Sequence, residues 1–315
     1  MRRTILFSSI LLLAAFAANG DVIRKGFNVG DGGTLTLDAD VGDVTVVSGG
    51  TGVAVEITRE GAPEDLRKND ITFNESGNDV SIRSKYDRDH NHWFGWMRDL
   101  KVRYNVRVPS HYNVKLATSG GDVDLGDLSG NADVRTSGGD IKMGHINGDV
   151  VGKTSGGDLR VASATGTMKV HSSGGDVEIE SSGGALEAKT SGGSIEIGRA
   201  GSTVYAHTSG GGIRIREALD SIDAETSGGS IHARMTRQPH GDSRMSTSGG
   251  DVVVELPANV GAAVDAHSSG GGIDSDLPVT IMGHKEDDSL VGTIGGGGPK
   301  LLLRTSGGGI SLRRG

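Results

Sequence analysis

The chain has 315 residues, 32 of them basic and 40 acidic, for a formal net charge of −8, with 54 glycines, 3% aromatic residues and no cysteine. Such an acidic balance disfavours nucleic acid as a partner, because phosphates require clustered Lys and Arg. The lack of cysteine excludes disulfides and lipid attachment at a cysteine, and the few aromatic rings are too scarce to fill a wide globular core.

The N-terminus has the three parts of a secretory signal peptide. Arg2 and Arg3 are followed by an apolar run from Ile5 to Phe16, and cleavage is expected after Ala17 or Gly20. That run is short of the ~20 residues that span a bilayer as a helix. We therefore predict a signal peptide over residues 1–20 and export to the periplasm, the cell surface or the medium, with no transmembrane helix in the mature chain. An uncleaved anchor is the alternative.

Residues 21–117 form a second segment, which we predict to be β-structure. It contains the first coils of a stack of β-coils and an insertion that interrupts them. An apolar pair with strand alternation recurs every nine residues, at Leu35/Leu37, Val44/Val46 and Val53/Val55. Winding into coils is therefore expected to begin near Thr34. Within residues 58–110 we predict a strand pair, around residues 71–73 and 80–82, and a further strand over 102–108. This insertion is interpreted as a cap that protects the edge of the first coil.

The loop between the predicted strand pair and the strand after it is the least repetitive part of the chain. His90 and His92 form an H-x-H pattern, which is a weak signal for a transition metal. With Asp87 and Asp89 they are the candidate metal ligands of the loop. Its candidate partner-binding residues are the aromatic side chains Trp93, Phe94 and Trp96. Exposed, these rings would form a contact site for a partner. Folded back, they would instead plug the end of the coils, which is the favoured interpretation.

Residues 118–315 are dominated by an internal repeat. Ser-Gly-Gly begins every 18 residues from Ser119 to Ser227, then at Ser248, Ser269 and Ser306 after steps of 21, 21 and 37. Aligned on this triplet, the apolar residues fall on two short strands with period-2 alternation, separated by glycine turns. Such strands bury their apolar faces only by stacking on those of neighbouring coils. We therefore predict an all-β fold, a single-stranded β-solenoid with two-strand coils of about 18 residues that stack in chain order.

Several segments carry a family resemblance. They are Arg107-Val108-Pro109, Asn113–Leu116, the T-S-G-G-D-V units and the C-terminal segments Val291–Gly298 and Leu301–Gly308. Over about residues 27–315 the chain resembles the bacterial β-strand-repeat domain family, a domain of unknown function whose members are known as "putative adhesins". The resemblance implies the repeat fold, and it brings no catalytic residues to this sequence.

Two sets of charged residues recur at fixed positions of the repeat. The carboxylates Asp122, Asp140, Asp158 and Asp176 would stack about 5 Å apart. Calcium could bridge them, but hydrogen bonding to turn backbone is favoured because Ser and Gly replace Asp in later coils. The second set, a cationic stripe, could grip an acidic polysaccharide, although a solvated face is the favoured interpretation. It consists of Arg135, Lys153, His171, Lys189 and His207.

The sequence favours an exported, non-enzymatic protein of the cell envelope or cell surface, with an adhesin-like binding role or a structural one. We expect no catalytic residues and no cofactor. The partner would be an envelope component, a surface polysaccharide or a protein. Alternatives are a structural β-roll stabilised by cations and, less favoured, a polysaccharide-active β-helix enzyme, which needs clustered acids.

Overall fold

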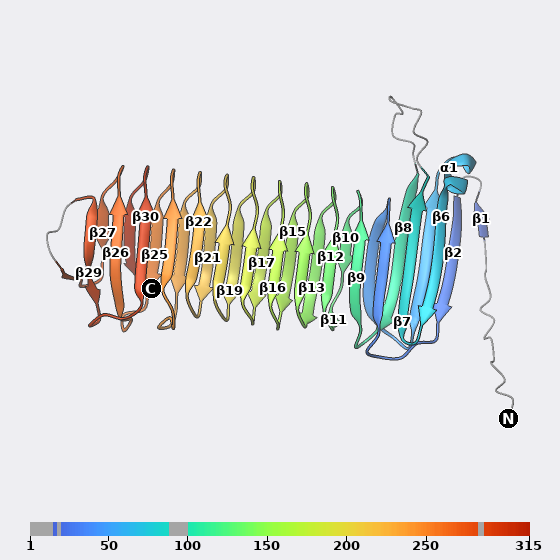
Figure 1. Ribbon diagram of the computed structural model, residues 1–315, viewed down its shortest axis with the longest axis horizontal. Coiled ribbons are helices and arrows are strands. Elements are labelled where there is room, and N and C mark those ends of the chain that lie inside the picture. The colour runs from blue at the N-terminus through green and yellow to red at the C-terminus, as the bar shows by residue number, and fades with distance from the viewer. Residues whose placement is uncertain (1–14, 18–19, 88–99, 283–286) are drawn as a thin grey trace. The chain divides into compact units, whose positions relative to one another are not determined.

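The computed structural model describes residues 15–17, 20–87, 100–282 and 287–315 (Figure 1). It divides into two compact units, Met1–Gly130 and Asn131–Gly315. Strands dominate both units, and each unit is built from two sheets, which we name A and B. The predicted all-β, solenoid-like class is therefore confirmed. Of the predicted signal peptide, only residues 15–17 and 20 are described.

The N-terminal unit has its strands in an order that differs from the chain order. In sheet A the order is β1 (Ala15–Ala17), β2 (Gly20–Phe27), β5 (Val53–Glu60), β8 (Lys101–Pro109), β4 (Asp43–Gly50) and β10 (Val123–Leu125). In sheet B it is β6 (Asn69–Ser76), β7 (Asp79–Tyr86), β3 (Thr34–Ala39) and β9 (Asn113–Thr118). The remaining elements of the unit are α1 (Pro63–Lys68) and β11 (Leu128–Ser129).

Strands β3 and β4 form a coil that lies between two coils formed later in the chain. Leu35 on β3 pairs in parallel with Val80 on one side and Val114 on the other. The predicted start of winding near Thr34 is thus correct. The expectation that Val53 and Val55 continue it is wrong, because β5 runs antiparallel to β2 and β8. Gly49, with φ of 103°, helps the chain to turn back within sheet A instead of crossing to sheet B.

The outer strands of this unit are held by a cluster of polar side chains. The strand pair predicted around residues 71–82 is the antiparallel pair β6–β7. Arg59 donates from Nη1 to the carbonyls of Leu66 and Asn69, at 3.1 and 2.8 Å, and from Nε to Asp21 Oδ1 at 2.8 Å. These bonds attach α1 and β2 to the edge of the unit. Nearby, burial raises the pKa of Tyr104 to about 12, so its phenol is neutral at physiological pH.

The C-terminal unit repeats one coil many times. Sheet A runs in the order β13 (Ile141–Asn147), β15 (Leu159–Ala164), β17 (Val177–Ser182), β19 (Ile195–Ala200), β21 (Ile213–Ala218), β23 (Ile231–Met235), β25 (Val252–Leu256), β31 (Ile310–Arg314) and β27 (Ile273–Ser275). Sheet B runs in the order β12 (Ala132–Arg135), β14 (Val150–Lys153), β16 (Met168–His171), β18 (Leu186–Lys189), β20 (Val204–His207), β22 (Ile222–Thr226), β24 (Ser243–Thr247), β30 (Lys300–Thr305), β26 (Ala262–Ser268), β29 (Ser289–Ile294) and β28 (Thr280–Ile281).

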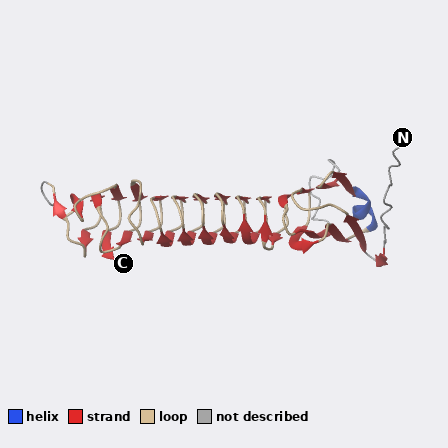
Figure 2. Ribbon diagram, turned by 90° about the horizontal axis from the view of Figure 1, so that it is seen from below, coloured by secondary structure: helices blue, strands red, loops and turns tan. Residues whose placement is uncertain are grey.

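The core of this unit is the space between the two facing sheets, which loops join (Figure 2). Equivalent residues of successive coils stand opposite one another in parallel register, as in the row Leu159, Val177, Ile195, Ile213 and Ile231. Each side chain in this row is at most 1% exposed. Burying one such aliphatic side chain stabilises the folded state by about 1.5–3 kcal/mol relative to leaving it exposed. Stacking therefore gives the short strands the core that none could form alone.

The last coil of the chain, β30–β31, lies between two coils formed before it. Leu301 on β30 pairs in parallel with Ser243 of β24 on one side and Val264 of β26 on the other. In sheet A, β31 likewise lies between β25 and β27. The expectation that all coils stack in chain order is thus wrong at this end. The segment after β27 forms β28 and β29, which add antiparallel strands beyond β26 and let the chain return.

Candidate functional site

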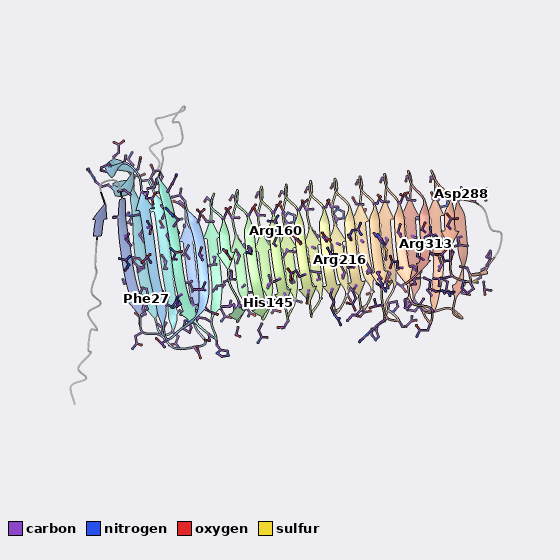
Figure 3. The ribbon with its side chains drawn as sticks, turned by 180° about the vertical axis from the view of Figure 1, so that it is seen from behind. Phe27, His145, Arg160, Arg216, Asp288 and Arg313 are labelled. Atoms are coloured by element: carbon purple, nitrogen blue, oxygen red, sulfur yellow. The ribbon has the colours of Figure 1, made fainter. Side chains whose placement is uncertain are left out.

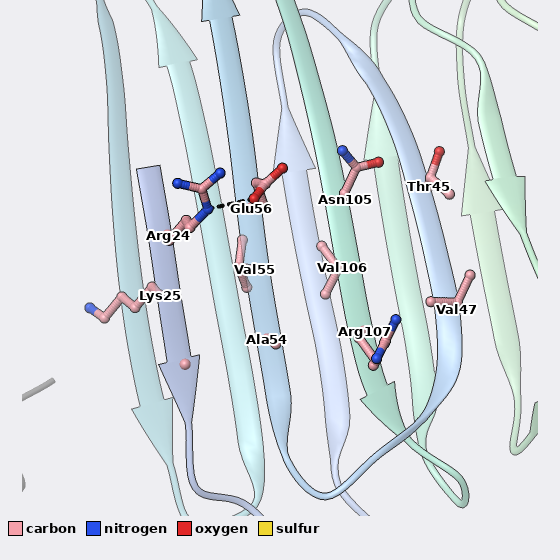
Figure 4. Close-up of a pocket in the computed structure, with 11 residues that line it drawn as sticks. Arg24, Lys25, Thr45, Val47, Ala54, Val55, Glu56, Asn105, Val106 and Arg107 are labelled. Carbon is pink, nitrogen blue, oxygen red and sulfur yellow. Dashed lines mark hydrogen bonds and ion pairs between the residues drawn. The ribbon is translucent and has the colours of Figure 1, made fainter. Parts of the chain in front are cut away.

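The solvent face of sheet A in the N-terminal unit is hollowed (Figure 4). The hollow has a volume of about 670 Å³ and is lined by β2, β5, β8 and β4. Three of these strands are adjacent antiparallel neighbours, and β4 is parallel to β8. The site is thus formed by segments that lie up to 83 residues apart in the sequence, from Arg24 to Arg107.

Strand register sets the outward side chains of the hollow in two rows. One row consists of Arg24, Glu56, Asn105 and Thr45. The other consists of Gly26, Ala54, Arg107 and Val47. The small residues of the second row leave space above the sheet, and a Cβ added to Gly26 would have no atom within 4 Å. The floor of the hollow is therefore small and apolar, and its rim is polar.

Some of the charged side chains that line the hollow form ion pairs and others do not. Arg24 donates from Nε to Glu56 Oε2 at 2.6 Å, and both side chains are about half exposed. Lys25 turns away, with its ammonium 5.2 Å from the Phe27 ring centroid and 4.7 Å from that of Phe73. Among the described residues, Arg107 has no ion-pair partner. Its guanidinium is an exposed cation beside a small apolar floor, a combination that suits a carboxylate or phosphate group.

The stacked aspartates make hydrogen bonds to backbone, as the favoured interpretation predicts. Asp140 Oδ1 accepts from the amide of Asp158 at 2.8 Å, and Asp158 Oδ1 accepts from the amide of Asp176 at 2.9 Å. Each bond joins one coil to the next, because the carboxylate accepts from a backbone amide in the turn of the neighbouring coil. Within the described ranges, no group of three or more His, Cys, Asp or Glu is arranged to hold a metal ion.

A buried hydroxyl next to each turn is a feature that the sequence reasoning missed. The Oγ1 of Thr190 donates to the carbonyl of Gly175 at 2.8 Å and accepts from the amide of Gly193 at 3.3 Å. The same bonds recur at Thr154, Ser172, Thr226, Thr247, Ser268 and Thr305. The signal was present in the sequence, since Thr or Ser precedes Ser-Gly-Gly in these coils.

Glycine is required in these turns because they stack closely. A Cβ on Gly157 would come within 2.2 Å of the Gly139 carbonyl oxygen and 2.5 Å of Asp140 Oδ1. Real Cβ atoms do not approach other atoms so closely, so the second glycine of the triplet cannot be replaced without moving the backbone. The turns consequently form a tight structural edge and not an open binding groove.

The predicted cationic stripe is a continuous row on the solvent face of sheet B. Strand pairing places Arg135, Lys153, His171, Lys189 and His207 opposite one another in successive coils. Arg135 is paired with Asp133, with Nε 2.8 Å from Oδ1, and Lys189 with Glu187, with Nζ 2.5 Å from Oε1. No ion pair involves Lys153 among the described residues.

The solvent face of sheet A in the same unit has charges of mixed sign. Its central row consists of Lys142, Arg160, Glu178, Glu196 and Arg214. Arg160 and Arg216 lie on β15 and β21 (Figure 3). Arg160 lies 3.5 Å from the next coil's Glu178, measured from Nε to Oε2, and Arg216 pairs with Glu196. Arg160 and Glu196 are therefore neutralised by side chains of other coils, in contrast to the row on sheet B.

Most of the predicted site residues of the N-terminal loop lie outside the described residues. Only Asp87 is described, and its amide donates to the carbonyl of Lys68 at 2.9 Å. The others are Asp89, His90, His92, Trp93, Phe94 and Trp96. Their metal-binding and partner-binding roles remain predictions.

The model of the domain family described as Toastrack DUF4097 matches residues 33–313. The chain belongs to the Toastrack family. This match includes the stacked coils of both units of the Toastrack chain, while β1 and β2 precede it. The resemblance to a β-strand-repeat family of unknown function is thereby confirmed.

Solved structures similar to this Toastrack chain share little sequence with it. A "putative adhesin" from Bacteroides fragilis is 17% identical, with 75% of this chain and 97% of that chain covered and a TM-score of 0.43. A "putative adhesin" from Parabacteroides distasonis is 15% identical, with the same coverage and a TM-score of 0.34. A "putative lipid binding protein" from Parabacteroides distasonis is 13% identical, with 94% and 97% covered and a TM-score of 0.35.

The search of curated proteins found no match. In the part of the chain that the structure describes, no helix has both the length and the apolar character needed to cross a membrane.

Proposed function

We propose that this chain is an exported, non-enzymatic protein of the cell envelope or cell surface, with an adhesin-like binding role. Its repeats would wind as a single-stranded β-solenoid that presents binding residues on rigid sheet faces. The signal sequence predicted at the N-terminus supports export. Residues held on strands keep their positions better than residues on loops, which favours recognition of a partner by a fixed surface.

The observation that carries the binding role is the unpaired guanidinium of Arg107 in the hollow of sheet A. The neighbouring Arg24 is already bonded to Glu56, so Arg107 is the group best able to take an acidic group from a partner. Ala54 and Val47 beside it offer apolar contact to the rest of that partner. We infer that the hollow binds an anionic group of an envelope component.

The residues of the hollow favour binding over hydrolysis. Glycoside hydrolysis commonly uses two carboxylic side chains flanking the scissile bond. Glu56 is the acid that lines the hollow, and Arg24 bonds its carboxylate. A role as a cation-stabilised roll is also less favoured, because the stacked carboxylates of Asp140 and Asp158 accept backbone amides.

The proposal is tested with isolated bacterial envelopes and the purified mature chain. The retained fraction is measured for the wild type, for Arg107→Gln and for the control Arg214→Gln. Arg214 is also an exposed arginine, and it lies on β21 in sheet A of the C-terminal unit. No ion pair involves it among the described residues. We expect Arg107→Gln to weaken retention about fivefold, the effect of roughly 1 kcal/mol, and the control to bind normally.

Two outcomes would count against the binding role. Equal retention of the wild type and Arg107→Gln would exclude the hollow as the binding site. Equal losses in both arginine variants would show a general effect of charge and no specific site. Thermal melting of each variant, followed by circular dichroism, checks that the fold is retained.

A further inference from the structure

A strip of basic and aromatic side chains crosses the solvent face of sheet B in the C-terminal unit. We name it the basic strip, and it lies on β14, β16, β18 and β20. Its residues are Lys153, Lys169, His171, Lys189, Tyr205 and His207. They occupy two adjacent outward rows in parallel register, so neighbouring side chains in a row are about 4.8 Å apart along the stack.

The strip carries more positive charge than its neighbours neutralise. On the two rows of these four strands, three lysines face the single carboxylate of Glu187. That carboxylate is bonded to Lys189, which leaves Lys153 and Lys169 exposed and without ion pairs among the described residues. On a chain with a formal net charge of −8, such a run is an exception that favours an anionic ligand.

Tyr205 gives the strip an aromatic surface. Its side chain is 38% exposed, an unusual degree for a tyrosine within a sheet of this chain. The Nζ of Lys189 lies 4.8 Å from the centroid of the Tyr205 ring. This cation–π contact favours one position of the ring on the sheet surface. An aromatic ring next to cations can contact the apolar face of a sugar while the cations bind its acidic groups.

Acidic side chains limit the strip at both ends. On β12, Asp133 is bonded to Arg135, and on β22 the outward residues are Asp223 and Glu225. The favourable region is therefore limited to two outward rows of side chains on four adjacent strands, β14 to β20. A ligand that fits it is itself an extended chain with acidic groups at short, regular intervals.

We propose that the basic strip binds a linear acidic polysaccharide, a polymer of uronic acid sugars, lying along the stack across β14 to β20. Such a polymer has one carboxylate on each sugar, and these can meet Lys153, Lys169 and Lys189 in succession. The choice of a polysaccharide over a nucleic acid rests on the proposed function, which places the chain outside the cytoplasm. The strip is only two rows of side chains wide, which suits a single extended polymer chain better than a broad membrane surface.

The test uses the purified mature chain and polygalacturonate, with neutral dextran as the control polymer. Affinity electrophoresis gives the dissociation constant at low and at physiological salt. The charge-reversal variant is Lys153→Glu/Lys169→Glu. Its matched control is Lys101→Glu/Lys142→Glu, which makes the same change in net charge at exposed lysines on sheet A strands, β8 and β13.

We expect the wild type to bind polygalacturonate, to ignore dextran and to lose affinity as salt rises. The Lys153→Glu/Lys169→Glu variant should bind about tenfold more weakly or worse, and the control within about twofold of the wild type. Tyr205→Ala should also weaken binding, while its melting temperature stays near that of the wild type because the ring is partly exposed.

Other results would overturn the proposal. Absence of binding to polygalacturonate, or an equal loss in the control variant, would do so. Equal or tighter binding to duplex DNA, or to vesicles of phosphatidylglycerol and phosphatidylcholine, would assign the strip to a different class of partner. These measurements use purified protein, so their outcome does not depend on whether the chain is exported. A chain that binds polygalacturonate but remains in the cytoplasm would contradict the proposed function and leave the site chemistry intact.

Discussion

The buried hydroxyl beside each turn joins one coil to the next. Thr190 is 3% exposed and satisfies both the carbonyl of Gly175 and the amide of Gly193. Valine has nearly the same shape as threonine but neither donates nor accepts. Thr190→Val should thus leave two backbone groups unsatisfied in a buried turn and lower the free energy of unfolding by about 1–3 kcal/mol.

Urea denaturation measures this loss through the shift of the midpoint at constant slope. The control is Ser191→Ala, the next residue in the same turn, whose side chain is exposed. It should change the free energy of unfolding by less than about 0.5 kcal/mol. Equal effects of the two substitutions would mean that the hydroxyl ladder contributes nothing specific.

Asp265 on β26 forms ion pairs with β30, and these should make the stability of the C-terminal unit depend on pH. Burial acts to raise the pKa of its carboxyl, but bonds from Arg304, at 2.7 Å, and Lys300, at 3.3 Å, outweigh burial and hold that pKa below 3.8. A carboxyl whose pKa is depressed by folding stabilises the protein above its unfolded pKa, and this contribution is lost as pH falls through the folded value.

The wild type should therefore lose melting temperature below about pH 4 more steeply than Asp265→Asn. Melting curves between pH 3 and pH 6 give the comparison. The control Asp223→Asn removes an exposed carboxyl of β22 for which no ion pair exists among the described residues. It should keep the pH dependence of the wild type. Parallel curves for the wild type and Asp265→Asn would exclude this role of Asp265.

At the scale of elements, the order of the coils is the feature that the sequence could not predict. Leu301 and Leu303 have the same alternation as Val264 and Ala266, and any coil with this pattern can stack on any other. Repeats therefore determine the strands and their register but not which coil lies beside which. The same holds near the N-terminus, where β3 and β4 lie between later coils.

The position of the last coil can be tested by cross-linking, because the chain has no cysteine of its own. Ser246 on β24 pairs with Arg304 on β30, and His267 on β26 pairs with the same Arg304 from the other side. Strands ~4.8 Å apart suit a disulfide. The pair Ser246→Cys/Arg304→Cys should cross-link on mild oxidation, as judged by mobility on a non-reducing gel.

The matched pair Ser246→Cys/His267→Cys tests the alternative. These positions would be neighbours if the coils stacked in chain order, but β30 separates them. We expect no disulfide there, because the distance of two strand spacings is too long. Cross-linking of this pair, and not of the first, would contradict the position of β30–β31.

The two candidate sites differ in how visible they are in the sequence. The basic strip follows the 18-residue period, so alignment of repeats already placed Lys153 and Lys189 in one row. The hollow depends on β2 and β5 running antiparallel, which brings Arg24 and Arg107 to one face. No period connects those residues, and the antiparallel arrangement itself was not predicted. Only the three-dimensional pairing of strands shows the hollow.

At the scale of the whole molecule, stability should not depend on calcium. The turn carboxylates of Asp140 and Asp158 accept amides from neighbouring coils, which satisfies them without an ion. Chelator or added calcium should thus shift the melting temperature by less than about 2 °C, an effect below roughly 1 kcal/mol. Magnesium at the same ionic strength is the control for general screening. A rise of many degrees with calcium alone would favour the cation-stabilised roll.

Export is the claim on which the envelope role depends. Both predicted cleavage positions leave Asp21, whose carboxylate is bonded to Arg59, in the mature chain. The predicted cleavage removes β1, the outermost strand of sheet A, but keeps the bond from Arg59 to Asp21 that attaches β2 to the unit.

The most direct test is to express the full chain in a bacterial host, separate cytoplasm from envelope and secreted material, and measure the intact mass of the product. We predict a mature chain that begins after Ala17 or Gly20, found outside the cytoplasm. A chain that keeps its N-terminal residues and stays in the cytoplasm would contradict the account.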